Sequence, residues 1–160
     1  MIRRKIYIPA RYKSRRFPGK LLKKINGETL ISIVIQKVIN SGFLPVLVSG
    51  DKTIVNYAQD RNINYLKSKQ KHISGMSRIS EVIKKDNSKI IYILFGDELY
   101  LSEKHIKKFI NNVNKNKKYS CWHLLTNIKV NDKNDLNVVK CLINTKKEIV
   151  DFTRKFKKNY

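Results

Sequence analysis

The chain has 160 residues, a length that suits one globular domain and is too short for two ordinary ones. Hydrophobic residues make up 41% and aromatic residues 9% of it, which excludes a disordered tail. Lys and Arg number 35 against 12 Asp and Glu, so the net charge is +23. Such a balance is typical of proteins that meet nucleic acid, an acidic membrane surface or a multiply charged small substrate.

The placing of the lysines argues against nucleic acid. They are spread along the whole chain, often beside Asn and Ile, as in residues 114–118. This pattern is typical of an AT-rich genome, which raises net charge without building a binding face. Aromatic residues are also not interleaved with the basic ones as a stacking platform would require. A nucleic-acid-binding protein, with affinity that falls steeply with salt, remains the alternative from a different class.

Cysteine usage and hydropathy indicate a cytoplasmic protein. Cys121 and Cys141 are far apart and neither begins a CxxC pair, so we expect no disulfide framework and no thiolate metal site. The N-terminal apolar stretch is too short for a signal peptide. No apolar run approaches the roughly 18 residues of a membrane-spanning helix.

The first third of the chain alternates strand and helix signals. Residues 5–8 form a short apolar run before Pro9 and predict a buried strand. Residues 9–20 lack a helical period and predict a loop, followed by a short extended piece over 21–25 and a turn at Asn26-Gly27. Apolar residues then recur every four positions and predict a helix over 29–41.

The alternation continues along the chain. Residues 44–48 predict a fully buried strand, and Asp51 is a good N-cap for a helix that ends near residue 60. A strand at 63–66, a loop at 67–76 and a further helix come next. The remaining expected elements are a strand at 89–95, a helix capped by Ser102, and strands at 119–128, 137–143 and 148–152.

Repeated strand–helix units predict an α/β fold: a Rossmann-like, three-layer α/β/α domain with a mostly parallel sheet. We expect a single domain over residues 1–160. Ligands bind such sheets at the carboxyl ends of the strands. The loops 9–20, 67–76 and 96–98 all fall at that edge, and all are non-periodic and either charged or glycine-bearing. The sequence therefore predicts a binding site there.

The loop 9–20 has the composition of an anion site. It gathers arginines and Lys20 around Ser14 and Gly19. Arginine binds phosphate oxygens with a fork of donors, lysine adds a point charge, and glycine lets backbone N–H groups approach. The GxxxxGK[ST] spacing of a P-loop is absent. A solvated basic loop without a ligand is the alternative.

Specific residues of this loop carry a resemblance to a known family. Ile8-Pro9-Ala10-Arg11-Tyr12, then Ser14, Arg16 and Pro18-Gly19-Lys20, resemble the opening signature of the 3-deoxy-manno-octulosonate cytidylyltransferases, or CMP-Kdo synthetases. The CMP-sialic acid synthetases share a looser form. The resemblance implies that this loop holds the triphosphate of CTP. The residues it implies for nucleotide binding are Pro9, Ala10, Arg11, Ser14, Arg16, Gly19, Lys20, His72, Ser74, Gly75 and Arg78.

The second loop supports the resemblance. His72, Ser74-Gly75 and Arg78 match a His-x-Ser-Gly-x-x-Arg segment that lines the family's nucleotide pocket. Met76 and Ser77 stand where the family usually has Thr and Glu. Considered by itself, His72 would be interpreted as an ordinary surface histidine.

In the third loop, Gly96-Asp97-Glu98 resembles the family's Gln-Gly-Asp-Glu-Pro. The resemblance implies that Asp97 binds the catalytic Mg²⁺, and a carboxylate at a strand end suits Mg²⁺ held against a phosphate. Phe95 and Leu99 replace the family's Gln and Pro. Without the resemblance, Asp97-Glu98 reads equally well as a helix-capping acidic pair.

Two later segments, 137–140 and 151–154, resemble strands of the family, so the resemblance runs from about residue 4 to residue 154. It implies a Mg²⁺-dependent transfer of CMP from CTP to a 3-deoxy-ulosonic acid such as Kdo, for surface-glycan synthesis, with Arg11, Lys20 and Asp97 catalytic. It also allows a homodimer.

Family members are longer than this chain. Their second half supplies much of the sugar-acid pocket, the dimer interface and a second metal-binding Asp. We therefore expect a domain that lacks this C-terminal portion, whether as a fragment or as a short homologue. A divergent CTP-binding protein with little or no catalytic activity is the alternative function.

Overall fold

The computed structural model describes residues 4–13, 17–69, 71–116 and 118–155. The chain divides into two compact units, with the boundary between Asn114 and Lys115. The single domain expected from the length stays a prediction.

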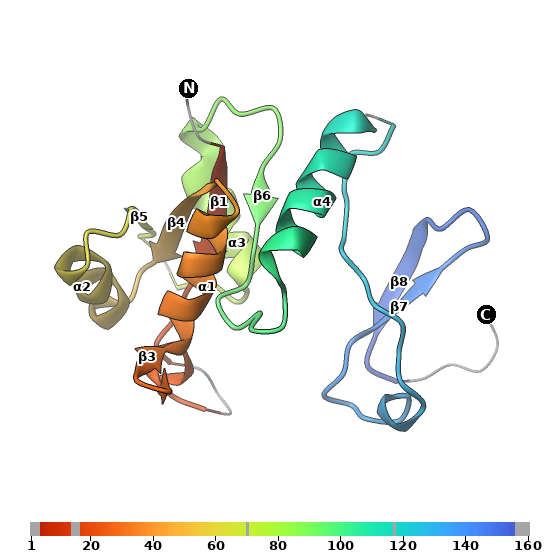
Figure 1. The fold of residues 1–160 in the computed structure, drawn as a ribbon, viewed down its shortest axis with the longest axis horizontal. Coiled ribbons are helices and arrows are strands. Elements are labelled where there is room, and N and C mark those ends of the chain that lie inside the picture. Colours follow the sequence, from red (N-terminus) through yellow and green to blue (C-terminus); the bar gives the residue numbers. More distant parts are fainter. Residues whose placement is uncertain (1–3, 14–16, 70, 117, 156–160) are drawn as a thin grey trace. The chain divides into compact units, whose positions relative to one another are not determined.

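In the described part of the first unit, four parallel strands form one sheet in the order β5-β4-β1-β6. They are β1 (Lys5–Pro9), β4 (Leu44–Ser49), β5 (Tyr65–Lys67) and β6 (Tyr92–Ile93). β1 pairs with β4 and with β6, and β4 pairs with β5. Because β1 lies in the middle, its carboxyl end at Pro9 opens onto the centre of the sheet edge (Figure 1).

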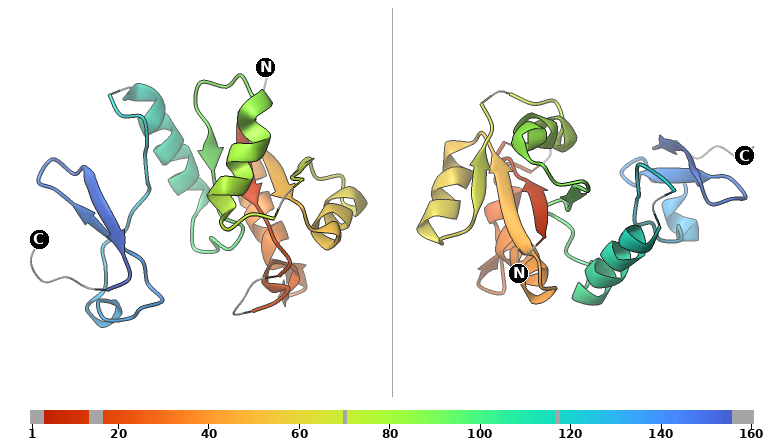
Figure 2. Two further views of the ribbon diagram at one scale, coloured as in Figure 1. Left: turned by 180° about the vertical axis from the view of Figure 1, so that it is seen from behind. Right: turned by 90° about the horizontal axis from the view of Figure 1, so that it is seen from above.

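Helices cover both faces of this sheet (Figures 1 and 2). They are α1 (Leu30–Asn40), α2 (Lys52–Asp60), α3 (Gly75–Val82), which continues into η2 (Ile83–Lys85), and α4 (Glu103–Lys115). α1 and α3 lie on opposite faces of β1. The predicted α/β fold with a mostly parallel sheet is confirmed.

The alternation of side chains along β1 builds a core on each face. Tyr7 points to the α3 face, where it packs with Val46, Val48 and Ile79. Its neighbours Ile6 and Ile8 point the other way because side chains alternate along a strand. The α1 face is closed by the buried residues Leu30, Ile31, Val34, Ile35 and Val38.

A short hairpin follows the first loop. η1 (Lys20–Leu22) leads into β2 (Lys24–Ile25), which pairs antiparallel with β3 (Glu28–Thr29). Asn26 and Gly27 both have positive φ, 50° and 87°, as a tight hairpin turn requires. The predicted turn is confirmed, whereas the extended piece is shorter than expected because its first part is helical.

Two predicted strands are wrong in extent or existence. The strand expected over 89–95 is reduced to Tyr92–Ile93, continued by one bond from the Leu94 N–H to the Tyr7 carbonyl. In the described part of the chain it pairs with β1 alone, and an apolar run cannot show how much of a strand is paired. The described residues between 119 and 128 form no strand, since apolar content alone supplies no partner for the backbone.

The second unit contains η3 (Val130–Asp132) and an antiparallel pair, β7 (Lys140–Ile143) with β8 (Ile149–Thr153). The buried Lys140 donates through Nζ to the carbonyls of Asp135 and Arg154. Arg154 donates through Nη1 to the carbonyls of Leu136 and Asn137, each at 2.9 Å. The late segments that resemble the family are thus joined to each other by their basic side chains.

Across the described ranges, every helix is too short or too polar to cross a membrane.

Candidate functional site

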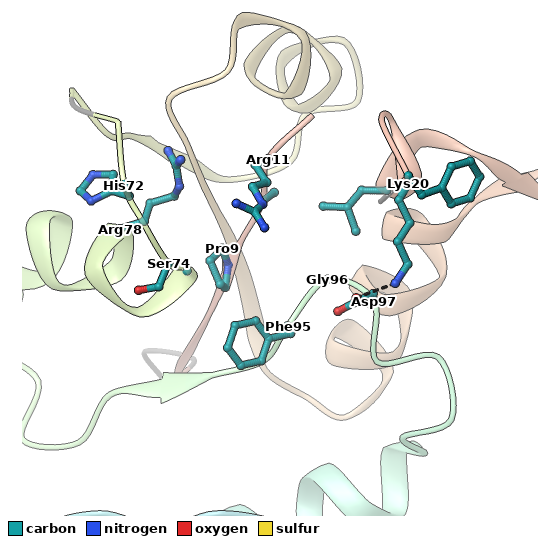
Figure 3. A pocket seen from close by; sticks show the side chains of 13 residues that line it. Pro9, Arg11, Lys20, His72, Ser74, Arg78, Phe95, Gly96 and Asp97 are labelled. Carbon is teal, nitrogen blue, oxygen red and sulfur yellow. Dashed lines mark hydrogen bonds and ion pairs between the residues drawn. The ribbon is translucent and has the colours of Figure 1, made fainter. Parts of the chain in front are cut away.

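A cavity of about 600 Å³ opens at the carboxyl edge of the sheet (Figure 3), within the size range of small-molecule sites. The three loops predicted to meet there do meet there. Thirteen residues line the cavity: Pro9, Ala10, Arg11, Phe17, Lys20, Leu21, His72, Ser74, Gly75, Arg78, Phe95, Gly96 and Asp97.

The first wall continues directly from β1. The Ala10 N–H donates to the Val48 carbonyl at 2.9 Å, which carries the sheet ladder one residue past Pro9. The Tyr12 N–H then donates to Asp51 Oδ2 at 2.8 Å. Asp51 occupies the expected N-cap position of α2, but its side chain makes no capping bond. Its carboxylate holds the loop backbone beside Arg11 instead.

Gly19 shapes the return of this loop and is not among the cavity-lining residues. Its φ is +71°, and its N–H donates to the Tyr12 carbonyl at 2.8 Å. A side chain at this position would be strained by that φ and would meet the Tyr12 ring. Gly19 thereby turns the chain so that the next residue, Lys20, faces the cavity. Ser14 and Arg16 lie outside the described residues.

Lys20 and Asp97 form an ion pair in the wall of the cavity, with Nζ and Oδ2 2.7 Å apart (Figure 3). Gly96 allows this approach. A Cβ on Gly96 would lie 2.7 Å from Cδ1 of the buried Ile31, closer than packed carbons tolerate. The backbone just before Asp97 therefore lies directly on α1.

The loop 96–98 offers two acidic side chains to a cation, fewer than a metal site built from protein ligands alone would need. Among the described residues, no cluster of three or more His, Cys, Asp or Glu could hold a metal ion. Asp97 and Glu98 are adjacent carboxylates, and Mg²⁺ is commonly held by one or two carboxylates plus phosphate oxygens. Partial burial, together with the neighbouring Asp97, raises the pKa of Glu98. The donor set fits Mg²⁺ that arrives with a phosphate ligand.

The second wall is tied to α3 through Glu81. Glu81 Oε1 accepts the Lys69 N–H at 2.9 Å, and Glu81 Oε2 lies 2.6 Å from His72 Nε2. The bond from the Lys69 backbone, with a smaller effect of His72, lowers the pKa of Glu81. His72 is thus a partner of Glu81 in the cavity wall, not the free surface histidine that its isolated position in the sequence would indicate.

α3 begins inside the predicted loop. Ser74 is its N-cap, and Ser74 and Ser77 bond each other's backbone N–H groups in a capping box. Ser77, which replaces the family's Glu, keeps this cap. Gly75 is the first helical residue, and a Cβ there would lie 3.0 Å from the Phe95 ring and 3.1 Å from Pro9. The three loops therefore touch at this glycine.

Arg78 is a buried cation in the cavity wall, 8% exposed. Its Nη1 donates to the buried Ser68 Oγ at 2.5 Å. Burial lowers the pKa of Arg78; the charge of Arg11 adds to this, whereas Asp51 and Glu81 act in the opposite direction. Arg78 and Arg11 both line the cavity (Figure 3), close enough for the charge of one to affect the other.

Sequence reasoning missed the apolar part of the site. Phe17 and Phe95 line the cavity with 47% and 44% of their surfaces exposed. Phe95 lies two residues past β6 and directly before the Gly-Asp pair, so its position close to a strand end was the available signal. Glu81 and Ser68 carried no signal, because their contacts are made between segments.

Comparison with known proteins assigns the chain to a protein family. The profile of the cytidylyltransferase family matches residues 6–157. This chain belongs to the cytidylyltransferase family.

Several curated relatives share the name 3-deoxy-manno-octulosonate cytidylyltransferase. The protein of Ruthia magnifica is 38% identical over 68% of this chain and 46% of the relative. The protein of Alteromonas mediterranea is 31% identical over 93% of this chain and 62% of the relative. The protein of Blochmanniella floridana is 34% identical over 87% of this chain and 59% of the relative. The chain spans about half the length of these relatives.

Solved structures agree on the fold. A CMP:2-keto-3-deoxy-manno-octonic acid synthetase in complex with CTP matches with a TM-score of 0.81 and 24% identity, over 98% of this chain and 66% of that one. A cytidylyltransferase from Leptospira borgpetersenii matches with a TM-score of 0.58 and 17% identity, over 74% and 51%.

Proposed function

We propose that the cavity binds CTP and that the chain supplies the nucleotide-binding part of an enzyme that transfers CMP to a 3-deoxy-ulosonic acid, Kdo first among them. The observation that carries the proposal is the convergence of Arg11, Lys20 and Arg78 with Asp97 around one cavity. The names of the curated relatives support the sugar acid, and the CTP-bound structural neighbour supports the nucleotide.

The basic side chains are suited to the triphosphate. Arg11 and Lys20 come from the loop after β1, and Arg78 approaches from α3, so three cations surround a cavity with room for a nucleotide. Fixed positive charges in a partly water-excluded site stabilise the charge that develops during phosphoryl transfer. We assign the phosphates to Arg11 and Lys20, with Ser14 and Arg16 as further candidates on the same loop.

The reaction would proceed by substitution at the α-phosphorus. The anomeric hydroxyl oxygen of the sugar acid forms a bond to this phosphorus, the bond to the β-phosphate bridging oxygen breaks, and pyrophosphate leaves with its electron pair. The hydroxyl proton passes to solvent or a nearby base. Positioning and electrostatic stabilisation by the basic residues would supply most of the rate enhancement.

Asp97, with Glu98 beside it, is the proposed ligand of Mg²⁺. When bound, the ion would neutralise phosphate charge. Asp97 lies at the end of the segment that follows β6, directly opposite Lys20, so its carboxylate can hold a cation next to the phosphates that Lys20 binds. A homodimer stays a prediction.

The proposal is tested by incubating the chain with CTP, Mg²⁺ and Kdo and measuring pyrophosphate release. Release that requires Kdo, and that is lost in Arg11→Ala, supports it. CTP binding without release limits the chain to the nucleotide-binding step. Absence of CTP binding contradicts the proposal.

A further inference from the structure

We propose that the Lys20–Asp97 ion pair couples the binding of nucleotide to the binding of the divalent cation. This inference rests on the proposed function and concerns the regulation of the same site. In the absence of both ligands, the Lys20 ammonium group occupies the cation-binding side of Asp97, and the Asp97 carboxylate occupies the phosphate-binding side of Lys20. Binding of either ligand separates the pair and prepares the site for the second.

The geometry favours this exchange. Lys20 Nζ lies 2.7 Å from Asp97 Oδ2, a distance typical of a charge-assisted hydrogen bond. A cation at Asp97 competes with the ammonium group, because both positive charges seek the same carboxylate. A phosphate at Lys20 competes with the carboxylate in the same way, since both are anions that seek the ammonium group.

The pair is weak enough to open. The side chains of Lys20 and Asp97 are 40% and 43% exposed, so water screens their attraction. Exposed pairs of this kind change an equilibrium by about two- to five-fold. The pair therefore suppresses unproductive binding of either ligand alone by a small factor and does not block the site.

Linkage makes the effect reciprocal. If Mg²⁺ at Asp97 frees Lys20 for phosphate, then phosphate at Lys20 must free Asp97 for Mg²⁺ by the same factor. The coupling favours CTP and Mg²⁺ bound together over either bound alone.

The first experiment measures CTP binding by isothermal titration with EDTA present. Asp97→Asn releases Lys20 without a metal, so this variant should bind metal-free CTP about two- to five-fold more tightly than the wild type. Loss of a carboxylate near a phosphate would raise affinity in any case. The same substitution is therefore repeated in a Lys20→Ala background, where the account predicts that most of the gain disappears.

The second experiment needs no nucleotide. Mn²⁺ binding is followed by electron paramagnetic resonance for the wild type, Lys20→Ala and Lys23→Ala. Lys23→Ala removes the same charge three residues further along the chain, where Lys23 lies over the Phe17 ring at 5.9 Å and not against Asp97. Lys20→Ala should tighten Mn²⁺ binding about two- to five-fold, and Lys23→Ala should change it less.

The outcomes separate this inference from the proposed function. An Asp97→Asn gain of equal size with and without Lys20, or equal effects of the two lysine variants on Mn²⁺, overturns the coupling even if the wild type binds CTP with Mg²⁺. Failure of the wild type to bind CTP with Mg²⁺ overturns the proposed function, and the Mn²⁺ comparison then still tests the ion pair.

Discussion

His72 and Glu81 join the second wall of the cavity to α3, with His72 Nε2 and Glu81 Oε2 2.6 Å apart. The other oxygen of Glu81 accepts the Lys69 N–H. One carboxylate therefore fixes two points of the segment that leads to Ser74.

Glu81→Ala is expected to weaken CTP binding several-fold without unfolding the chain, because it frees this wall. Glu81→Gln should be intermediate, since the amide oxygen can still accept one bond. Isothermal titration with CTP and Mg²⁺ measures the effect, with Glu28→Gln on the β2–β3 hairpin as the charge-matched control. Equal affinities for Glu81→Ala and the control would contradict a positioning role.

Ser68→Ala tests the buried bond between Ser68 and Arg78. It leaves a guanidinium N–H of a buried side chain without this acceptor, and an unsatisfied group of this kind costs about 1–3 kcal/mol. We expect a lower midpoint of thermal unfolding and weaker CTP binding. An unchanged midpoint would mean that the guanidinium finds another partner at no cost.

Gly96→Ala tests the close approach of the Asp97 loop to α1. The added methyl group would lie 2.7 Å from Ile31 Cδ1, and overpacking of a core typically costs about 1–3 kcal/mol. The loop must move to accommodate the methyl group. We therefore expect the free energy of CTP binding in the presence of Mg²⁺ to weaken by more than the free energy of unfolding falls. Gly42→Ala is the control for a steric clash: its φ of +85° strains the backbone, but its Cβ would meet nothing within 4 Å.

The order of strands and helices could be predicted from the sequence because burial on both faces leaves a strong pattern. The helix at 29–41 and the strand at 44–48 are correct within about two residues. The strand at 89–95 is overextended, because the apolar run does not show where backbone pairing stops. The start of α3 at Gly75 was also missed, although Ser74 is a good N-cap.

The candidate site was predictable where its residues are consecutive and follow a strand. Pro9, Ala10, Arg11, Lys20, Ser74, Gly75 and Asp97 line one cavity as expected. Their ligand-binding roles stay predictions. Gly19 shapes the return of the loop, and its predicted binding role stays a prediction as well. Asp51 holds the Tyr12 backbone in place of capping α2. The contacts of Asp51 with Tyr12 and of Lys20 with Asp97 join residues 39 and 77 positions apart, and no local pattern reports them.

Asp86 provides a pH-dependent contribution to stability. Its carboxylate accepts from the Ser88 N–H, from Tyr7 OH and from Lys5 Nζ. The Ser88 bonds first, and then Tyr7, hold the pKa of Asp86 well below its usual range, whereas burial and Asp86 raise that of Tyr7. Because the pKa of Asp86 is lower in the folded chain, its ionised carboxylate stabilises the fold at pH values above the unfolded pKa of about 3.9. This stabilisation is lost as pH falls further.

Asp86→Asn should therefore reduce the free energy of unfolding at neutral pH by about 1–3 kcal/mol, which lowers the midpoint of thermal unfolding. The difference in stability from the wild type should shrink below about pH 4. For Tyr7 the sign is reversed: its contribution is complete below about pH 10 and is lost above it. Thermal unfolding across pH measures both. A difference that is constant down to pH 2 would contradict the assignment to Asp86.

The most direct measurement is isothermal titration of the chain with CTP and Mg²⁺, beside ATP as a competing nucleotide and with Arg11→Ala as the variant. The account predicts one CTP site per chain, weaker binding of ATP, and at least ten-fold weaker CTP binding in Arg11→Ala, since a charge-assisted bond to phosphate is worth about 1.5–3 kcal/mol. CTP binding that is absent, or that is unchanged by Arg11→Ala, would contradict the assignment of this cavity to the nucleotide.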